Sequence, residues 1–99
     1  MIRHLVLLRF KPETPSARQA ELEAAFAGLA HAVSEVQALE WGVNSSPEGL
    51  EKGFTHCFFV TFAGAAERDA YLPHPSHQAF VEQLKPWLAD VLVLDYELA

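Results

Sequence analysis

Residues 54–62 read Phe-Thr-His-Cys-Phe-Phe-Val-Thr-Phe, the run of this chain that most favours β-structure. In such a strand, successive side chains point to opposite faces of a sheet. One face would carry Phe54, His56, Phe58, Val60 and Phe62, and the other would carry Cys57 and Phe59. Both faces are largely apolar, so both need a covering layer in the folded protein.

Three further strands are predicted on either side of this run. Residues 2–10 combine branched and aromatic side chains over a strand length, and Lys11-Pro12 ends them. Residues 39–44 predict a short strand that ends in a turn-rich segment, and residues 91–98 predict the last strand. In the first strand one face carries His4, Val6, Leu8 and Phe10.

Two helical regions separate these strands. The first begins at Ser16, which stands at capping-box spacing from Gln19, and continues through apolar residues at steps of three and four. A short helix is predicted over residues 65–71. Two prolines interrupt it, and Ser76 can cap a further helix with an apolar side.

The resulting order, β-α-β-β-α-β, is typical of α+β domains with a ferredoxin-like fold. We expect a single domain over residues 1–99, with a four-stranded, mostly antiparallel sheet and both helical regions on one face. The other face would then be an exposed apolar patch. We therefore predict a homodimer in which two sheets pack face to face and form an α+β barrel.

Composition limits the partners of the chain. With 99 residues, 51% of them hydrophobic, there is enough apolar material for one core. The formal net charge is -6 and the seven Lys and Arg residues are scattered, which argues against binding to nucleic acid or to an anionic membrane. The first residues resemble neither a signal peptide nor a membrane span, so we expect a cytoplasmic protein. Cys57 is the single cysteine, and it excludes an internal disulfide.

Histidine and tyrosine side chains suggest a site between the sheet and the helices. His4 and His56 have the same parity on strands expected to be neighbours, and Tyr71 and His77 come from the second helical region. His77 is expected in the first turn of a helix, where the macrodipole disfavours the imidazolium. A neutral His77 could act as a general base while Tyr71 donates a hydrogen bond to the developing oxyanion.

A purely structural role fits the same residues. His4 and His56 could be core histidines, each hydrogen-bonded to a backbone carbonyl or to Asp95. Tyr71 could pack in the core while His77 faces solvent at a helix start. The sequence leaves both alternatives open.

The sequence favours neither a metal nor a cofactor. His56, His74 and His77 are residues of a type that binds zinc, but no carboxylate or cysteine joins them at a spacing typical of zinc sites. There is no glycine-rich phosphate loop and no nucleophile elbow. We therefore expect no metal and no cofactor.

Several segments, in this order, make the chain resemble the stress-responsive A/B-barrel (Dabb) family. They are His4-Leu5-Val6-Leu7-Leu8-Arg9-Phe10-Lys11, Trp41-Gly42-Val43-Asn44, Lys52-Gly53-Phe54-Thr55-His56, Val60-Thr61-Phe62, Tyr71 to His77 and Val93-Leu94-Asp95-Tyr96. The resemblance implies a dimeric α+β barrel, and the family includes a plant polyketide cyclase that works by aldol condensation without a metal.

The resemblance also implies roles for individual residues. The catalytic tyrosine and histidine of that cyclase match Tyr71 and His77, and its two further pocket histidines match His4 and His56. The rest of the substrate-binding set is expected to be Val6, Leu8, Phe26, Phe58 and Asp95. Glu23 stands where the cyclase has an aromatic side chain, which argues against a long alkyl substrate.

Two functional hypotheses follow from these observations. In the first, the chain binds a small organic molecule in a pocket lined by histidine and tyrosine, either as a binding protein or as a cyclase-like enzyme with His77 as base. In the second, it is a non-catalytic, stress-associated dimer in which the histidines serve packing.

Overall fold

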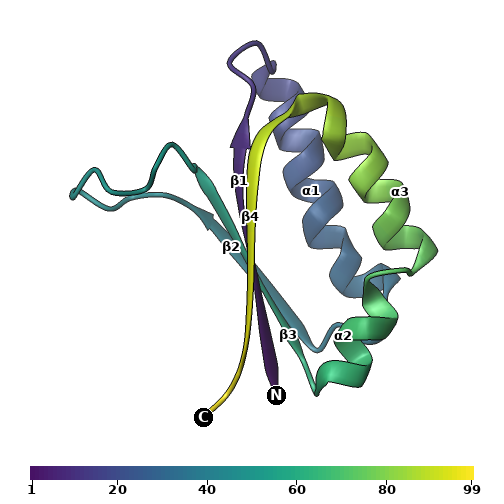
Figure 1. Cartoon of the computed structure of the whole chain (residues 1–99). Coiled ribbons are helices and arrows are strands. Elements are labelled where there is room, and N and C mark those ends of the chain that lie inside the picture. Colours follow the sequence, from purple (N-terminus) through teal and green to yellow (C-terminus); the bar gives the residue numbers. More distant parts are fainter.

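The computed structural model describes residues 1–99 as one four-stranded sheet with helices on a single face (Figure 1). Its elements, in chain order, are β1 (Ile2–Phe10), α1 (Ser16–Ala32), β2 (Ala38–Val43), β3 (His56–Phe62), α2 (Ala65–Tyr71), α3 (Pro75–Leu84), the 3-10 turn η1 (Lys85–Trp87) and β4 (Leu88–Glu97). The predicted ferredoxin-like fold is confirmed.

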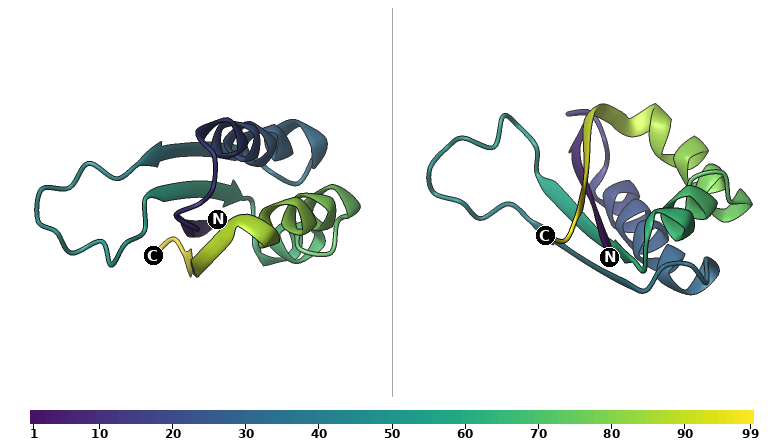
Figure 2. Two further views of the ribbon diagram at one scale, coloured as in Figure 1. Left: turned by 90° about the horizontal axis from the view of Figure 1, so that it is seen from above. Right: turned by 60° about the horizontal axis from the view of Figure 1, so that its bottom comes forward.

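The sheet has the strand order β2-β3-β1-β4, and every neighbouring pair is antiparallel. β1 and β3 therefore occupy the middle, while β2 and β4 form the two edges. Two further views show that α1, α2 and α3 all lie to one side of the sheet (Figure 2). The loop between β2 and β3 projects away from the helices, on the left in Figure 1.

The core lies where α1 and α3 cover β1 and β3. On the covered face of the sheet the buried side chains include Val6, Leu8, Phe58 and Val60. Phe26 of α1 stacks on Phe58 with ring centroids 3.9 Å apart and also contacts Phe80 of α3 at 4.9 Å. Burial of one such aromatic side chain contributes roughly 1.5–3 kcal/mol, so this cluster fixes both helices on the sheet.

Element boundaries differ from the expected ones by a few residues. β3 begins at His56 rather than Phe54, and β2 spans Ala38–Val43. β4 begins earlier than expected, because Leu88 pairs with Phe10 across a register shift in β1. The extra residues of β4 are thus held by pairing rather than by their own β-propensity.

The predicted helix caps are wrong at both sites. At α1 the N-cap position belongs to Pro15, and no side chain caps the helix, so Ser16 and Gln19 form no capping box. At α3 the cap is His74 rather than Ser76: His74 Nδ1 accepts the Ser76 backbone N–H at 3.1 Å. Pro75 takes the first helical position, which suits a residue without an N–H group.

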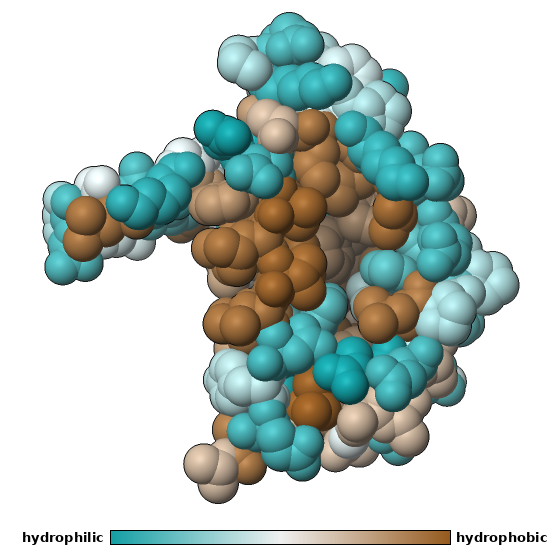
Figure 3. Space-filling model, viewed as in Figure 1, coloured by the Kyte–Doolittle hydropathy of each residue, from teal (hydrophilic) through white to brown (hydrophobic).

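The face of the sheet opposite the helices is uncovered and apolar; we call it the open face. Its edge strand leaves Leu92, Leu94 and Tyr96 exposed, while Leu5 and Phe59 on the middle strands are half-buried. Apolar surface gathers over β4 in Figure 3. No helix of the structure combines the length and hydropathy that crossing a membrane requires.

The cap at α3 can be tested by removing one side chain. We expect His74→Ala to lower the free energy of unfolding by about 0.5–2 kcal/mol, since the Ser76 N–H loses its acceptor. Urea denaturation measures the change. His31→Ala is the matched control, because His31 is exposed on α1, and its effect should stay within about 0.5 kcal/mol. Equal losses in both variants would contradict the cap.

Candidate functional site

A cavity of about 290 Å³ lies between α3 and the edge strand β4. It exists because the helices pack on β1 and β3 and leave the inner face of β4 uncovered. Val91 and Val93 form one wall, and Phe80 and Leu84 of α3 form another. The hollow beside the apolar surface of β4 is visible in Figure 3. Nine of its 12 lining residues are hydrophobic, so it suits the apolar part of a ligand.

His77 reaches this cavity from the first turn of α3. Its Nδ1 lies 2.9 Å from the carbonyl oxygen of Leu72. A carbonyl can only accept, so Nδ1 carries the proton and donates it, and in the neutral ring Nε2 keeps a free lone pair. This is the form of histidine that can remove a proton from a ligand.

The pKa of His77 lies below its ordinary value. Burial is the main cause; charge on His4 and His74 lowers it further, while the hydrogen bond to Leu72 acts in the opposite direction. The direction agrees with the expectation from the sequence, but the dominant cause is desolvation rather than the helix dipole. His77 is therefore neutral at physiological pH.

Tyr71 ends α2 next to His77 and is completely buried. Its ring centroid lies 4.4 Å from that of His77 and 6.1 Å from that of His4, and both histidines line the cavity. No protein group lies within hydrogen-bonding distance of the Tyr71 hydroxyl. Burial raises the pKa of Tyr71, so the hydroxyl keeps its proton and is a donor without an acceptor.

His4 is held by a chain of hydrogen bonds that crosses three elements. Its Nδ1 lies 2.6 Å from Asp95 Oδ1 on β4, and Arg68 Nη1 of α2 donates to Asp95 Oδ2 at 2.9 Å. Of the two partners considered for His4 as a core histidine, a backbone carbonyl and Asp95, the structure shows Asp95. Burial acts to raise the pKa of Asp95, but the hydrogen bonds from Arg68 and His4 outweigh it, and the pKa is lowered.

Arg68 is a residue of this site that sequence reasoning missed. It stands one helical turn before Tyr71, a spacing that places both side chains on the same side of α2. This spacing from Tyr71 is the feature of the sequence that could have identified Arg68 as a residue of the site. Nothing in the sequence connects Arg68 with Asp95, which is 27 residues away.

His56 does not join His4, which corrects the expected pocket. In the register of β1 and β3, His4 pairs with Val60 while His56 pairs with Leu8, four positions along the strand or about 13 Å. The two histidines share the covered face but lie at opposite ends of it. The Phe26–Phe58 stack occupies the space between these ends.

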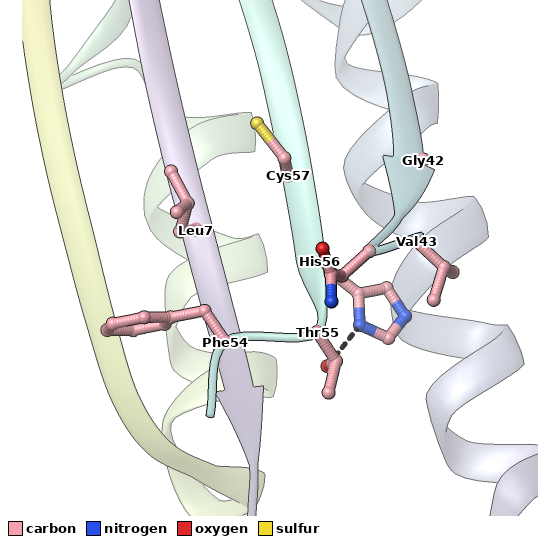
Figure 4. Close-up of a pocket in the computed structure, with 8 residues that line it drawn as sticks. Leu7, Gly42, Val43, Phe54, Thr55, His56 and Cys57 are labelled. Atoms are coloured by element: carbon pink, nitrogen blue, oxygen red, sulfur yellow. Dashed lines mark hydrogen bonds between the residues drawn. The ribbon is translucent and has the colours of Figure 1, made fainter. Parts of the chain in front are cut away.

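His56 has its own partners at the other end of the sheet. Its Nε2 lies 2.7 Å from Glu23 Oε2, and its Nδ1 lies 2.7 Å from Thr55 Oγ1. Figure 4 shows the ring directed at Thr55, beside Val43. Trp41 stacks parallel to the ring with centroids 6.0 Å apart. In the sequence, Glu23 stood out only because the similar cyclase has an aromatic residue at that position. In the structure it is the partner of a buried histidine.

The remaining predicted binding residues divide into two groups. Val6 and Phe26 line the cavity together with His4 and His77, whereas the buried Tyr71 packs behind His77 and does not line it. Leu8 and Phe58 are almost fully buried in the core and do not line it, because the side chains around them close the layer at that point. Asp95 lies behind His4 rather than on the cavity wall. No three His, Cys, Asp or Glu side chains lie close enough together to hold a metal ion.

Comparison with known proteins adds to this geometry. The family model described as "Stress responsive A/B Barrel Domain" matches residues 2–98. Olivetolic acid cyclase from Cannabis sativa is 27% identical over 95 residues, which cover 96% of this chain and 94% of that protein.

Two solved structures show the same fold. Hydroxynitrile lyase from Passiflora edulis aligns with a TM-score of 0.93 and 25% identity, covering 99% of this chain and 93% of that one. A dimeric ferredoxin-like protein from Jannaschia sp. CCS1 aligns with a TM-score of 0.84 and 30% identity, covering 98% of each chain.

The state of His77 can be measured directly. We expect its ring to titrate below about 6.5 in the folded protein, because burial disfavours the imidazolium. NMR titration of the ring protons gives the value. Since the unfolded chain then binds more protons, lowering the pH through about 6.5 toward the folded pKa should destabilise the protein.

The His77→Asn variant removes this contribution, so its free energy of unfolding should depend less steeply on pH over the same interval. A pKa of His77 that is higher in the folded protein than in the urea-unfolded protein would contradict the prediction of a neutral ring.

Proposed function

The chain belongs to the stress responsive A/B barrel domain family, and from this membership and the geometry of the cavity we propose that it binds a small organic molecule between α3 and β4. One observation carries the proposal: the buried Tyr71 hydroxyl has no protein partner, and the Tyr71 ring packs against His77, which lines an otherwise apolar cavity. A ligand oxygen that accepts this hydrogen bond would complete the site.

The free-energy cost of a buried hydroxyl without a partner supports this interpretation of Tyr71. An unsatisfied buried hydroxyl costs about 1–3 kcal/mol, a cost that a bound acceptor removes. The nine hydrophobic lining residues would take up the apolar part of the same molecule. A dry cavity of about 150 Å³ holds one benzene molecule, so a cavity of about 290 Å³ suits one ring with substituents rather than a long chain.

Proton transfer next to a carbonyl is the reaction that these groups would support. His77 Nε2 would take a proton from the carbon beside a carbonyl group, and the Tyr71 O–H would donate to the enolate oxygen that forms. In a cyclase-like reaction the enolate carbon then bonds to a second carbonyl of the same molecule. The oxygen of that carbonyl takes the proton back from His77, so the step is balanced.

Two observations favour this enzymatic reading. The lowered pKa of His77 keeps the base unprotonated near neutrality. Two proteins similar to this chain along nearly their whole lengths carry the names of enzymes, a cyclase and a lyase. The alternative is a binding protein that uses the same cavity without chemistry.

We also propose that the chain forms a homodimer through its open face. Leu92 and Leu94 are about half exposed on that face, and Leu5 lies beside Leu94 in the sheet. Burying such a patch against a second copy removes it from water. Similar structures, including the one from Jannaschia sp. CCS1, are described as dimeric.

The cellular setting is proposed on the same basis. The family description supports a role in stress response. A single free cysteine, Cys57, is compatible with a reducing compartment such as the cytoplasm.

Ligand binding is tested by thermal shift with phenolic, β-keto and short aromatic carboxylic compounds. At 100 times its Kd a ligand stabilises the native state by about 2.7 kcal/mol, which raises Tm by about 10 °C or more for a chain of this size. Tyr71→Phe and His77→Gln should each reduce the shift.

Tyr96→Phe and His31→Gln are the matched controls, because they make the same chemical changes away from the cavity. Equal shifts in all four variants would place binding elsewhere. A flat screen across the whole panel would favour the structural, stress-associated role.

The proposed interface is tested by placing a charge on it. Leu94→Asp should convert dimers into monomers or aggregates, since burying an unpaired carboxylate is unfavourable. Size-exclusion chromatography with light scattering measures the mass. Val43→Asp is the control, because Val43 is equally exposed but lies on the other face of the sheet. An unchanged dimer mass for Leu94→Asp would rule out the open face.

A further inference from the structure

Arg68, Asp95 and His4 form a hydrogen-bonded relay that ends at the cavity. Each oxygen of the Asp95 carboxylate has one partner, Oδ1 with His4 Nδ1 at 2.6 Å and Oδ2 with Arg68 Nη1 at 2.9 Å. The side chains of Arg68 and Asp95 are 23% and 21% exposed, and that of His4 only 5%. The relay is therefore shielded from solvent, most strongly at the end that lines the cavity.

We propose that Arg68 is a positioning residue that acts through Asp95 to keep His4 neutral, with the proton on Nδ1 and a free lone pair on Nε2. The role of this His4 tautomer in ligand binding rests on the proposed function. The protonation state of His4 itself does not, because it depends only on side chains of the protein.

The tautomer follows from the partner of Nδ1. An ionised carboxylate only accepts, so His4 Nδ1 must donate to Asp95. Nδ1 is also the one ring nitrogen of His4 with a hydrogen-bond partner in the protein. In the neutral ring, Nε2 is therefore an acceptor on a residue that lines the cavity.

The charge of His4 depends on what balances the Asp95 carboxylate. Arg68 supplies one positive charge at 2.9 Å, so Asp95 is already paired without a proton on His4 Nε2. Without Arg68, the shielded carboxylate would have His4 as its one partner and would favour the imidazolium. Nε2 would then change from an acceptor into a donor.

The other groups around His4 do not replace Arg68. Asp69 pairs with the Nε of Arg68 on the far side of the guanidinium. Tyr71 and Phe62 face His4 as neutral rings, and charge on His4 lowers the pKa of His77, so positive charges on both histidines disfavour each other. Arg68 is the one cation that contacts the carboxylate.

The consequence for recognition is a defined pattern of hydrogen bonding. The site presents two acceptor nitrogens, one on His4 and one on His77, and the rings of both lie against the ring of Tyr71, whose hydroxyl has no acceptor in the protein. A ligand with a hydroxyl group near its carbonyl matches this pattern better than a simple ketone. Protonation of His4 would invert one of the two acceptors.

The test is ¹⁵N NMR of the histidine rings at pH 7, in which the shifts of Nδ1 and Nε2 report which nitrogen carries a proton. In the wild type we expect His4 to show one protonated nitrogen, Nδ1. In Arg68→Met we expect the Nε2 resonance to move toward that of a protonated nitrogen. Arg68→Lys should restore the wild-type pattern, because it restores the charge.

Arg18→Met is the matched control, since Arg18 pairs with Glu21 on the exposed side of α1 and should leave His4 unchanged. Amide spectra establish that each variant is folded. If Arg68→Met does not fold, Arg68→Gln makes the same test while keeping a hydrogen-bond donor.

Two results would overturn the proposal: a wild-type His4 protonated at Nε2, or a His4 pattern that does not change when the charge of Arg68 is removed. A merely structural role of Arg68 would alter stability without changing the protonation of one ring. Since no ligand is used, the result is independent of whether any compound binds the cavity.

Discussion

The packing of two helices on the two middle strands is the constraint on which the rest of this structure depends. Phe26 stacks on Phe58 and touches Phe80, and this cluster draws α1 and α3 over β1 and β3. In this position the helices do not extend over the edge strand β4. The cavity is thus a product of the same packing that makes the core, and it opens on the edge strand β4, where the helices leave Val91 and Val93 exposed.

Buried polar groups divide the layer between sheet and helices into two unlike ends. At one end His56 is satisfied twice, by Glu23 and Thr55, and is shielded by Trp41. At the other end, hydrogen bonding is incomplete: Tyr71 has no partner, and His4 and His77 each use one ring nitrogen. Satisfied groups hold a fold together, whereas unsatisfied ones are able to bind, so the second end is the one that supports the proposed binding of a ligand.

The sequence predicted the elements and faces of this fold because strand parity and helical spacing are local properties. The alternation in residues 54–62 and the parity of β1 correctly placed His4, Val6, Phe58 and Val60 on the covered face. Register is not local: parity allowed His4 and His56 to meet, and the pairing of β1 with β3 separated them by four positions. Features that depend on the pairing of distant strands, such as the separation of these two histidines, could therefore not be predicted from the sequence.

The same limit explains the missed partners. Glu23 and Arg68 are charged residues on helices, and their sequence context resembles that of any solvated helix surface. Each becomes significant only when the helix is docked and its side chain meets a buried group, His56 in one case and Asp95 in the other. The caps followed a similar pattern, since Ser76 had the usual residue type but His74 had the right geometry.

The uneven distribution of polarity around the cavity has a consequence for stereochemistry. His4 and His77 stand at one end, with Tyr71 behind them, while Val91 and Val93 of β4 form an apolar wall. A planar carbonyl group has two faces that are mirror images of each other, but no mirror plane relates the surroundings of this cavity. A carbonyl compound held with its oxygen toward Tyr71 would therefore offer one chosen face to attack, and a new carbon centre formed there would have a single handedness.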